Sequence, residues 1–334
     1  MGRVYIVTGA NGFLGSNLIR KLLDYGESEI RALVLPGESV ASLEGLSCDI
    51  YYGDVTRPET LDELFRLSDD KEPLVIHCAA VVYIKSKENP RVYDVNVNGT
   101  KNIVEKTLEM NARLVYVSSV HAIPEKPENE LITEICEFAP QKVVGQYAKT
   151  KAEAANYVLK TVQTRNLNAC IVHPSGIIGP GDYGSSHLTQ LMIDFAKGRL
   201  TACVKGGYDF VDVRDVADGI ISACDKGVPG ECYLLTNRYV EVKELLDLIS
   251  EARNMKKIKT VLPMWFAELT APLSELYYAL RKQPPLYTKY SLYTLRSNSH
   301  FTNEKAKREL GYKNRDLRTT VMDTIAWLTE QNRI

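Results

Sequence analysis

The chain has 334 residues, 45% of them hydrophobic, which is long enough for one large domain or a domain with a smaller lobe. Its 41 basic and 42 acidic side chains give a net charge of −1, which argues against binding to nucleic acid or an anionic membrane. Seven scattered cysteines, with no Cys-x-x-Cys pair, predict reduced thiols and no metal site. No segment is apolar for the length of a membrane span and no signal peptide is visible, so we expect a cytoplasmic protein with no membrane partner.

The first half of the chain alternates strand-like and helix-like patterns. Strands are predicted at 4–7, 29–35, 49–52, 74–77, 114–118 and 169–173, and helices at 16–23, 60–67 and 99–110. Regular alternation of this kind predicts parallel strands joined by right-handed crossovers. We therefore predict an α/β fold in which residues 1–173 form a Rossmann-type, doubly wound parallel sheet that binds a dinucleotide.

The second half loses this alternation after Pro174. Glycine and proline cluster over 176–184, and helices are predicted at 240–252, 263–280, 303–310 and 318–328. A seventh strand is predicted at 232–235, so segments around 210–236 return to the core sheet. The rest of residues 174–334 is expected to form mainly a smaller, mostly helical, substrate-binding lobe.

A glycine-rich turn follows the first strand. It reads Thr8-Gly9-Ala10-Asn11-Gly12-Phe13-Leu14-Gly15. Strand, glycine turn and helix together place the pyrophosphate of a dinucleotide at a helix N-terminus, where glycines let the backbone approach the phosphates. The alternative is an ordinary strand-to-helix turn that needs glycine only for its shape. The flanking strand and helix favour cofactor binding.

A second group of residues points to proton transfer. Tyr147 and Lys151 are four residues apart in a predicted helix, so their side chains share one helix face. A nearby cation lowers the pKa of a phenol toward the range that a general acid or base needs. Ser118 and Ser119 end a predicted strand and offer a hydroxyl beside the phenol. Alone, Tyr-x-x-x-Lys is common on solvated helices.

In this order, the glycine turn, the serine and Tyr-x-x-x-Lys resemble the extended branch of the short-chain dehydrogenase/reductase superfamily. Further matching segments are Gly53–Val55, His77–Ala80, Asp94–Thr100, His173–Gly181 and Phe210–Ala217. Within that branch the chain looks most similar to the dihydroflavonol reductase and 3β-hydroxysteroid dehydrogenase-like group, which is related to NAD-dependent epimerases.

The resemblance implies a role for each matching residue. Ser119, Tyr147 and Lys151 would be catalytic, with Ser119 in better register than Ser118. The implied cofactor-binding residues are Gly9, Asn11, Gly12, Phe13, Leu14, Gly15, Asp54, Val55, Ala79, Ala80, Tyr147, Lys151 and Pro174. Tyr83 and His121 are candidates for substrate contact, although His121 could equally be an ordinary loop residue. His173 is expected to be structural.

The choice of cofactor depends on the end of the second strand. An acidic side chain there binds the ribose 2′-hydroxyl of NAD, whereas an arginine holds the 2′-phosphate of NADP. Leu35 stands where related reductases often have the arginine, and Glu38 follows closely. These residues favour NAD(H) weakly, and Arg31 leaves NADP(H) possible.

Two enzyme functions fit these residues. The first is an NAD(P)-dependent oxidoreductase that interconverts a carbonyl and an alcohol on a hydrophobic small molecule. The alternative is a nucleotide-sugar epimerase or dehydratase with bound NAD, which needs basic groups for the substrate diphosphate. The chain reads Tyr208-Asp209-Phe210 where sugar-nucleotide enzymes commonly have Arg-Asp-Phe. A third, non-enzymatic possibility is a redox-sensing regulator, against which the Ser-Tyr-Lys set argues.

Two further expectations concern apolar surfaces. Aromatic side chains over 263–293 predict a pocket for a ring-containing carbonyl compound, although a helix in this lobe must also bury one stripe in the core. The predicted members of that pocket are Trp265, Phe266, Leu269, Leu273, Tyr277, Tyr278, Tyr287, Tyr290 and Tyr293. A homodimer is also expected, through an apolar face formed by Val143, Ala148, Ala152, Ala155 and Leu159, unless that face packs within the monomer.

Overall fold

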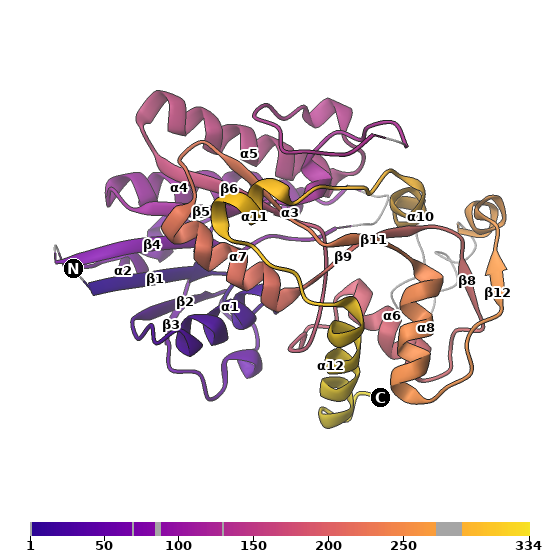
Figure 1. Cartoon of the computed structure of the whole chain (residues 1–334). Helices are drawn as coiled ribbons and strands as arrows, with labels where there is room; N and C mark the ends of the chain where they lie inside the picture. The colour runs from indigo at the N-terminus through magenta and orange to yellow at the C-terminus, as the bar shows by residue number, and fades with distance from the viewer. Residues whose placement is uncertain (1, 69, 84–87, 129, 272–288) are drawn as a thin grey trace.

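The computed structural model of the chain describes residues 2–68, 70–83, 88–128, 130–271 and 289–334. Its main element is a seven-stranded sheet with the order β10-β6-β5-β4-β1-β2-β3 (Figure 1). The strands are β1 (Gly2–Thr8), β2 (Ile30–Val34), β3 (Asp49–Tyr52), β4 (Lys71–His77), β5 (Arg113–Val117), β6 (Asn168–Pro174) and β10 (Cys232–Leu235). All its strand pairs are parallel, which confirms the predicted Rossmann-type sheet and its seventh strand.

Strand β1 lies inside the sheet, between β4 and β2, because its side chains are apolar on both faces. Val4 and Ile6 face one core, whereas Tyr5 and Val7 face the other, and all four are at most 2% exposed. Continuous apolar character of this kind is typical of parallel strands covered by helices on both sides. The carboxyl ends of the parallel strands share one edge, where the functional loops gather.

Helices cover both faces of this sheet (Figure 1). On one face, α1 (Phe13–Asp24) packs against α7 (Val213–Lys226), and α11 (Glu304–Leu310) contacts α7. On the other face, α4 (Thr100–Glu109) packs against α5 (Gln146–Arg165), with the short helices α2 (Asp62–Phe65) and α3 (Pro90–Tyr93) nearby in sequence. Two separate hydrophobic cores result, one on each side of the sheet.

The smaller lobe carries helices and two small sheets. Its helices are α6 (His187–Ala196), α8 (Val242–Arg253), α10 (Lys289–Arg296) and α12 (Leu317–Glu330), with a further helical stretch at 264–271. One sheet has the order β11-β9-β7, from β7 (Gly176–Ile178), β9 (Gly207–Asp212) and β11 (Arg238–Glu241), and the other pairs β8 (Ala202–Val204) with β12 (Thr260–Leu262). These strands were not predicted, because at three to six residues they show too little periodicity.

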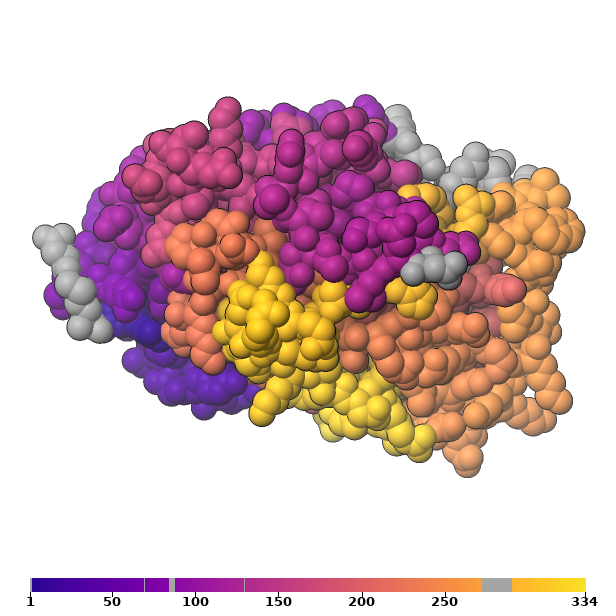
Figure 2. Space-filling view, turned by 45° about the horizontal axis from the view of Figure 1, so that its top comes forward, coloured from indigo at the N-terminus to yellow at the C-terminus, as the bar shows by residue number. Residues whose placement is uncertain are grey.

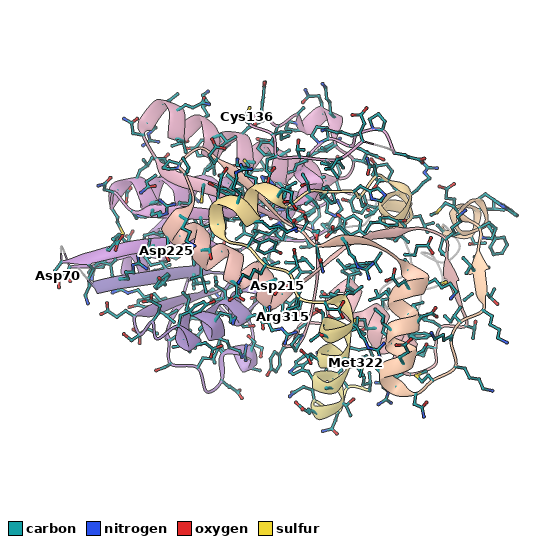
Figure 3. All side chains as sticks on the ribbon, in the orientation of Figure 1. Asp70, Cys136, Asp215, Asp225, Arg315 and Met322 are labelled. Carbon is teal, nitrogen blue, oxygen red and sulfur yellow. The ribbon has the colours of Figure 1, made fainter. Side chains whose placement is uncertain are left out.

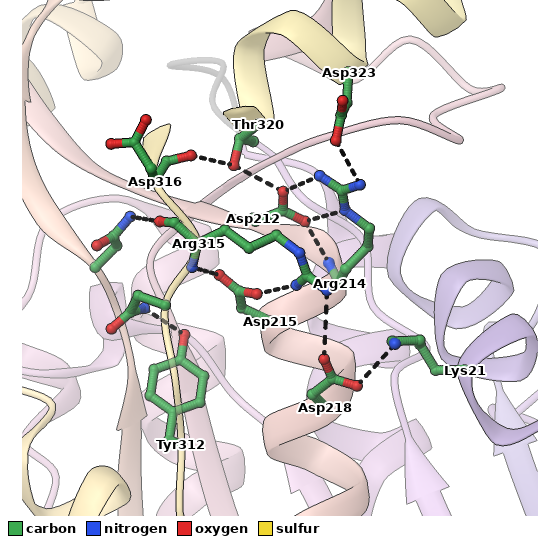
Figure 4. Close-up of polar contacts among 12 residues, drawn as sticks. Lys21, Asp212, Arg214, Asp215, Asp218, Tyr312, Arg315, Asp316, Thr320 and Asp323 are labelled. Atoms are coloured by element: carbon green, nitrogen blue, oxygen red, sulfur yellow. Dashed lines mark hydrogen bonds and ion pairs between the residues drawn. The ribbon is translucent and has the colours of Figure 1, made fainter. Parts of the chain in front are cut away.

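An ionic network joins the C-terminal segment to α7 and β9, as Figure 4 shows. The backbone N–H of Arg315 donates to Asp215 Oδ2 (2.7 Å), and its guanidinium pairs with the same carboxylate. Arg214 pairs with Asp212 (2.6 Å) and with Asp323 of α12 (2.8 Å). Figure 3 labels Asp215 and Arg315 next to each other, and Figure 2 shows the yellow C-terminal residues lying against both the magenta and the orange parts of the chain.

The predicted aromatic helix at 263–280 is described only over its first part. Residues 264–271 are helical, whereas Leu273, Tyr277, Tyr278 and Tyr287 lie outside the described residues. Trp265 and Leu269 are 65% and 69% exposed and Phe266 is 39% exposed, so these three side chains point to solvent. The buried stripe of this stretch is instead made by Ala267 and Ala271, which pack with Leu292.

The predicted dimer face is not a surface. Val143, Ala148, Ala152, Ala155 and Leu159 are all between 0% and 7% exposed and belong to the core between α5 and the sheet. Their small side chains let α5 approach its own sheet closely, so this expectation about the contact residues was wrong. A homodimer built on other residues stays a prediction.

No helix in the described part of the chain is long and apolar enough to span a membrane. The described His, Cys, Asp and Glu side chains form no group of three or more that could hold a metal ion. All seven cysteines are free thiols, of which Cys136 is exposed at the surface (Figure 3).

Candidate active site at the carboxyl edge of the sheet

The glycine turn between β1 and α1 has no room for side chains. Gly9 has φ +64°, and a Cβ there would lie 2.9 Å from Ala79 Cα. A Cβ on Gly15 would lie 2.2 Å from Gly9 O. Gly12 precedes α1 and gives no side-chain cap to its first turn. The N-terminus of α1 therefore presents uncapped backbone N–H groups beside a closely packed backbone, which fits a dinucleotide pyrophosphate.

Other predicted cofactor-binding residues lie around this turn. Asn11 Nδ2 donates to Glu38 Oε2 (2.9 Å) and Ser39 O (3.1 Å), so the loop after β2 reaches the turn. Phe13 and Leu14 are half-buried in the first turn of α1. Asn17, which was not predicted, donates to Pro180 O (3.2 Å) and brings the loop after β7 beside the same turn.

The ends of β3 and β4 supply the next predicted positions. Asp54 accepts hydrogen bonds from the backbone N–H (2.9 Å) and hydroxyl (2.8 Å) of Thr56, so its carboxylate is held in place locally. Val55 is buried and packs on the start of α4, where a Cβ on Gly99 would meet it at 2.6 Å. Ala79, which is followed by half-buried Ala80, donates its N–H to Thr8 Oγ1 (3.1 Å) and thereby joins the loop after β4 to β1.

Ser119, Tyr147 and Lys151 are brought together between β5 and α5. All three are at most 8% exposed. Burial raises the pKa of Tyr147 to about 12, and a hydrogen bond with Ser119 opposes this rise. The pairing of a serine hydroxyl with the phenol is the arrangement that the sequence predicts.

Lys151 bonds to the end of β5. Its Nζ donates to Val117 O (2.7 Å) and to Tyr116 Oη (3.4 Å), and it lies 4.8 Å from the centre of the Tyr116 ring. Burial lowers the pKa of Lys151 to about 7. The expected lowering of the Tyr147 pKa by this lysine is absent here, because burial of the phenol dominates and the ammonium is directed at a carbonyl of β5.

His173 and Pro174 close the site from β6. His173 Nδ1 bonds to Ser119 O (3.0 Å), so this buried histidine holds the backbone of the predicted catalytic serine. Pro174 ends β6, and the hydroxyl of the next residue, Ser175, donates to Asp209 Oδ1 on β9. Strand β9 therefore supports the residue that directly follows Pro174.

His121, one of the two residues predicted to contact substrate, lies beside Tyr147. Its ring makes an edge contact with Tyr147 (6.1 Å) and stacks on Tyr208 (5.5 Å), and Tyr290 packs against it (5.9 Å). Tyr83 is half-buried at the end of the loop after β4, directly before residues outside the described part of the chain. Tyr290 was predicted to line an aromatic substrate pocket, and it lies here. Tyr208 was not singled out, because β9 meets the site only through tertiary packing.

The cofactor-selecting residues take distinct places. Glu38 contacts the glycine turn through Asn11, as described above, and Leu35 directly follows β2. Arg31 lies at the other end of β2, where its guanidinium donates to the carbonyls of Glu63, Leu64 and Arg66. These three carbonyls hold it away from the carboxyl edge of the sheet.

Comparison with known proteins agrees with this geometry. Residues 5–235 match the NAD dependent epimerase/dehydratase family. The chain is 32% identical to sterol demethylase protein B of Methylococcus capsulatus over 98% of this chain and 99% of the relative. It is 27% identical to a putative dihydroflavonol 4-reductase of Synechocystis over 98% of this chain and 95% of that protein. The crystal structure of gox2253 is 30% identical, covers 99% of both chains and superposes with a TM-score of 0.85.

These matches cover the glycine turn, the Ser-Tyr-Lys group and the second lobe together, as the sequence motifs suggested. The chain therefore belongs to the NAD-dependent epimerase/dehydratase family, and it is an NAD(P)-dependent enzyme of the extended short-chain dehydrogenase/reductase branch.

Proposed function

We propose that this enzyme interconverts a carbonyl and an alcohol on a hydrophobic small molecule. The observation that carries the proposal is the surroundings of Tyr147, whose phenol lies among Ser119, the neutral His121 ring and two further tyrosines. Burial lowers the pKa of His121 to about 4, so the ring carries no charge at neutral pH. Such surroundings suit an apolar, ring-containing substrate.

In the proposed reaction, Tyr147 exchanges its phenolic proton with the substrate oxygen while Ser119 shares the hydrogen bond and orients the phenol. Protonated Lys151 has three N–H donors, of which Val117 and Tyr116 occupy two, and the third would hold a ribose hydroxyl of a bound cofactor. A bound nicotinamide supplies or accepts the hydride. Burial of all three side chains excludes water from the proton transfer.

A nucleotide diphosphate would need free basic side chains to bind it. Two of the candidates are already paired with carboxylates, which supports the oxidoreductase over the epimerase alternative. Arg214 is bound to Asp212 and Asp323, and Arg199 pairs with Asp194 on α6 at 2.9 Å. Lys205 is exposed, and Arg281 lies outside the described residues. One relative is named sterol demethylase protein B, and a sterol is a hydrophobic ring compound of the kind proposed here.

We propose NAD(H) as the preferred cofactor. Glu38 is positioned by Asn11 beside the glycine turn, and Arg31 is held by three carbonyls at the far end of β2. A carboxylate near the ribose favours the free 2′-hydroxyl of NAD over a 2′-phosphate. Fluorescence titration should give tighter binding of NADH than of NADPH, and a strong preference for NADPH would overturn this assignment.

The function is tested by Tyr147→Phe. We expect binding of NADH to survive, because the ring is kept, while reduction of cyclic ketones such as 1-tetralone falls by about 10²–10⁴-fold through loss of the proton donor. Tyr157→Phe is the matched control on the same helix, since its hydroxyl bonds to Glu105 (2.9 Å) away from the site. Calorimetric binding of UDP-sugars together with inactivity on every apolar ketone would favour the epimerase alternative.

A further inference from the structure

His121, Tyr208 and Tyr290 form a hydrogen-bonded group that the proposed proton transfer does not use. Tyr208 Oη lies 3.0 Å from His121 Nε2, and Tyr290 Oη lies 3.3 Å from His121 Nδ1. The three residues come from the loop after β5, from β9 and from α10, so three distant segments converge on one imidazole. Both ring nitrogens are therefore engaged by phenols.

This group contains more polar hydrogens than hydrogen bonds. A neutral imidazole has one N–H donor and one acceptor nitrogen, and each phenol adds one O–H. Burial holds His121 neutral, so the group has three polar hydrogens for two hydrogen bonds. One phenol donates to the imidazole and the other accepts from it, whichever tautomer is present. The accepting phenol keeps an O–H that no member of the group takes.

This group is fixed next to the reacting centre. The His121 backbone N–H donates to Ser119 Oγ (3.2 Å), so the same loop carries the predicted catalytic serine and the imidazole. Tyr290 packs on Gly145, two residues before Tyr147, where a Cβ would lie 2.5 Å from its ring. Ionised Tyr147 would raise the pKa of both Tyr208 and Tyr290, which places both phenols within electrostatic reach of it.

We propose that His121, Tyr208 and Tyr290 are specificity-determining residues whose spare phenol O–H donates to a second oxygen of the substrate, in addition to the oxygen that reacts at Tyr147. This inference rests on the proposed function. The group carries no charge, so the second oxygen is a neutral acceptor such as a hydroxyl, ether or carbonyl, whereas a carboxylate would call for a cation. The preferred substrate is a hydrophobic ring compound with two neutral oxygens.

The test compares 1-tetralone with its methoxy-substituted isomers, using NADH oxidation by the full-length enzyme. One neutral hydrogen bond corresponds to a preference of about 3- to 10-fold in kcat/KM for the isomer that presents its ether oxygen to the phenol. In Tyr208→Phe/Tyr290→Phe we expect this ratio to fall to about one, mainly through KM. The single variants identify which phenol donates.

Two controls separate the outcomes. Tyr239→Phe on β11, whose ring stacks on His300 (4.8 Å), should leave the ratio as in the unmodified enzyme. NADH titration and far-ultraviolet circular dichroism confirm that each variant folds and binds cofactor. A preference that persists in the double variant, or the absence of any preference in an enzyme that reduces tetralones, overturns this inference and leaves the proposed function standing. Inactivity on all tetralones and other apolar ketones contradicts the proposed function itself.

Discussion

The β1–α1 turn and the β9–α7 segment both reach the site, but they are built in opposite ways. The turn uses eight consecutive residues whose function depends on backbone and on the absence of side chains, as at Gly9 and Gly15. The β9–α7 segment acts through side chains that meet partners far away in sequence, such as Tyr208 with His121 and Asp209 with Ser175. The function of a local motif such as the β1–α1 turn can therefore be predicted from sequence, whereas the role of the β9–α7 segment cannot.

The largest effect should come from breaking the ionic contact at the start of α7. Arg315→Met leaves Asp215, which is 3% exposed, without its guanidinium partner. Loss of one member of a buried pair costs about 3–5 kcal/mol. The Arg315 side chain is 31% exposed and its backbone N–H still donates to Asp215, so we expect a cost of about 3 kcal/mol, at the lower end of this range. Urea unfolding measures this change in the free energy of unfolding.

The matched control is Arg318→Met, because Arg318 is 59% exposed and pairs with Glu251 at the surface. An exposed pair contributes about 0–1 kcal/mol. Equal destabilisation by both substitutions would show that the contact at α7 has no special weight.

A second effect should appear as a pH dependence at Asp209. Burial raises the pKa of Asp209 to about 6. Asp209 ionises near pH 4 in the unfolded chain but only near pH 6 in the folded chain. The folded state therefore loses stability as the pH rises from about 4 to about 6. Asp209→Asn removes the titration, and its stability relative to the unmodified enzyme should therefore increase by about 2–3 kcal/mol between pH 4 and pH 7.

Thermal unfolding at a series of pH values measures the Asp209 effect, with Asp49→Asn on the outer strand β3 as the control. A stability difference between Asp209→Asn and the unmodified enzyme that does not vary with pH would show that Asp209 does not titrate in this range.

The smallest effect is expected at the turn. In Gly15→Ala, the new Cβ would lie 2.2 Å from Gly9 O, so the backbone must shift. Overpacking of this kind costs about 1–3 kcal/mol, which we expect as a loss of NADH affinity of about 10- to 100-fold. Gly184→Ala is the control, since its nearest contact would be an ordinary 3.8 Å. Unchanged NADH binding in Gly15→Ala would argue that the turn does not hold the pyrophosphate.

The sequence determined the sheet and the local motifs of this protein. The parallel order follows from apolar runs that alternate with amphipathic helices, and the glycine spacing and Tyr147-x-x-x-Lys151 are contained within one turn and one helix. In such segments the interactions that determine the structure act between residues close in sequence, so the sequence pattern alone predicts them. The short strands of the second lobe lack this periodicity and were missed.

Tertiary structure alone decided what surrounds these motifs. It buried the small face of α5 against its own sheet, turned Trp265 outward and directed Lys151 to Val117 and Tyr116. It also brought Tyr208 and Tyr290 to the two nitrogens of His121 across 87 and 169 residues of sequence. Contacts over such separations depend on the packing of the whole chain, and no local propensity or spacing encodes them.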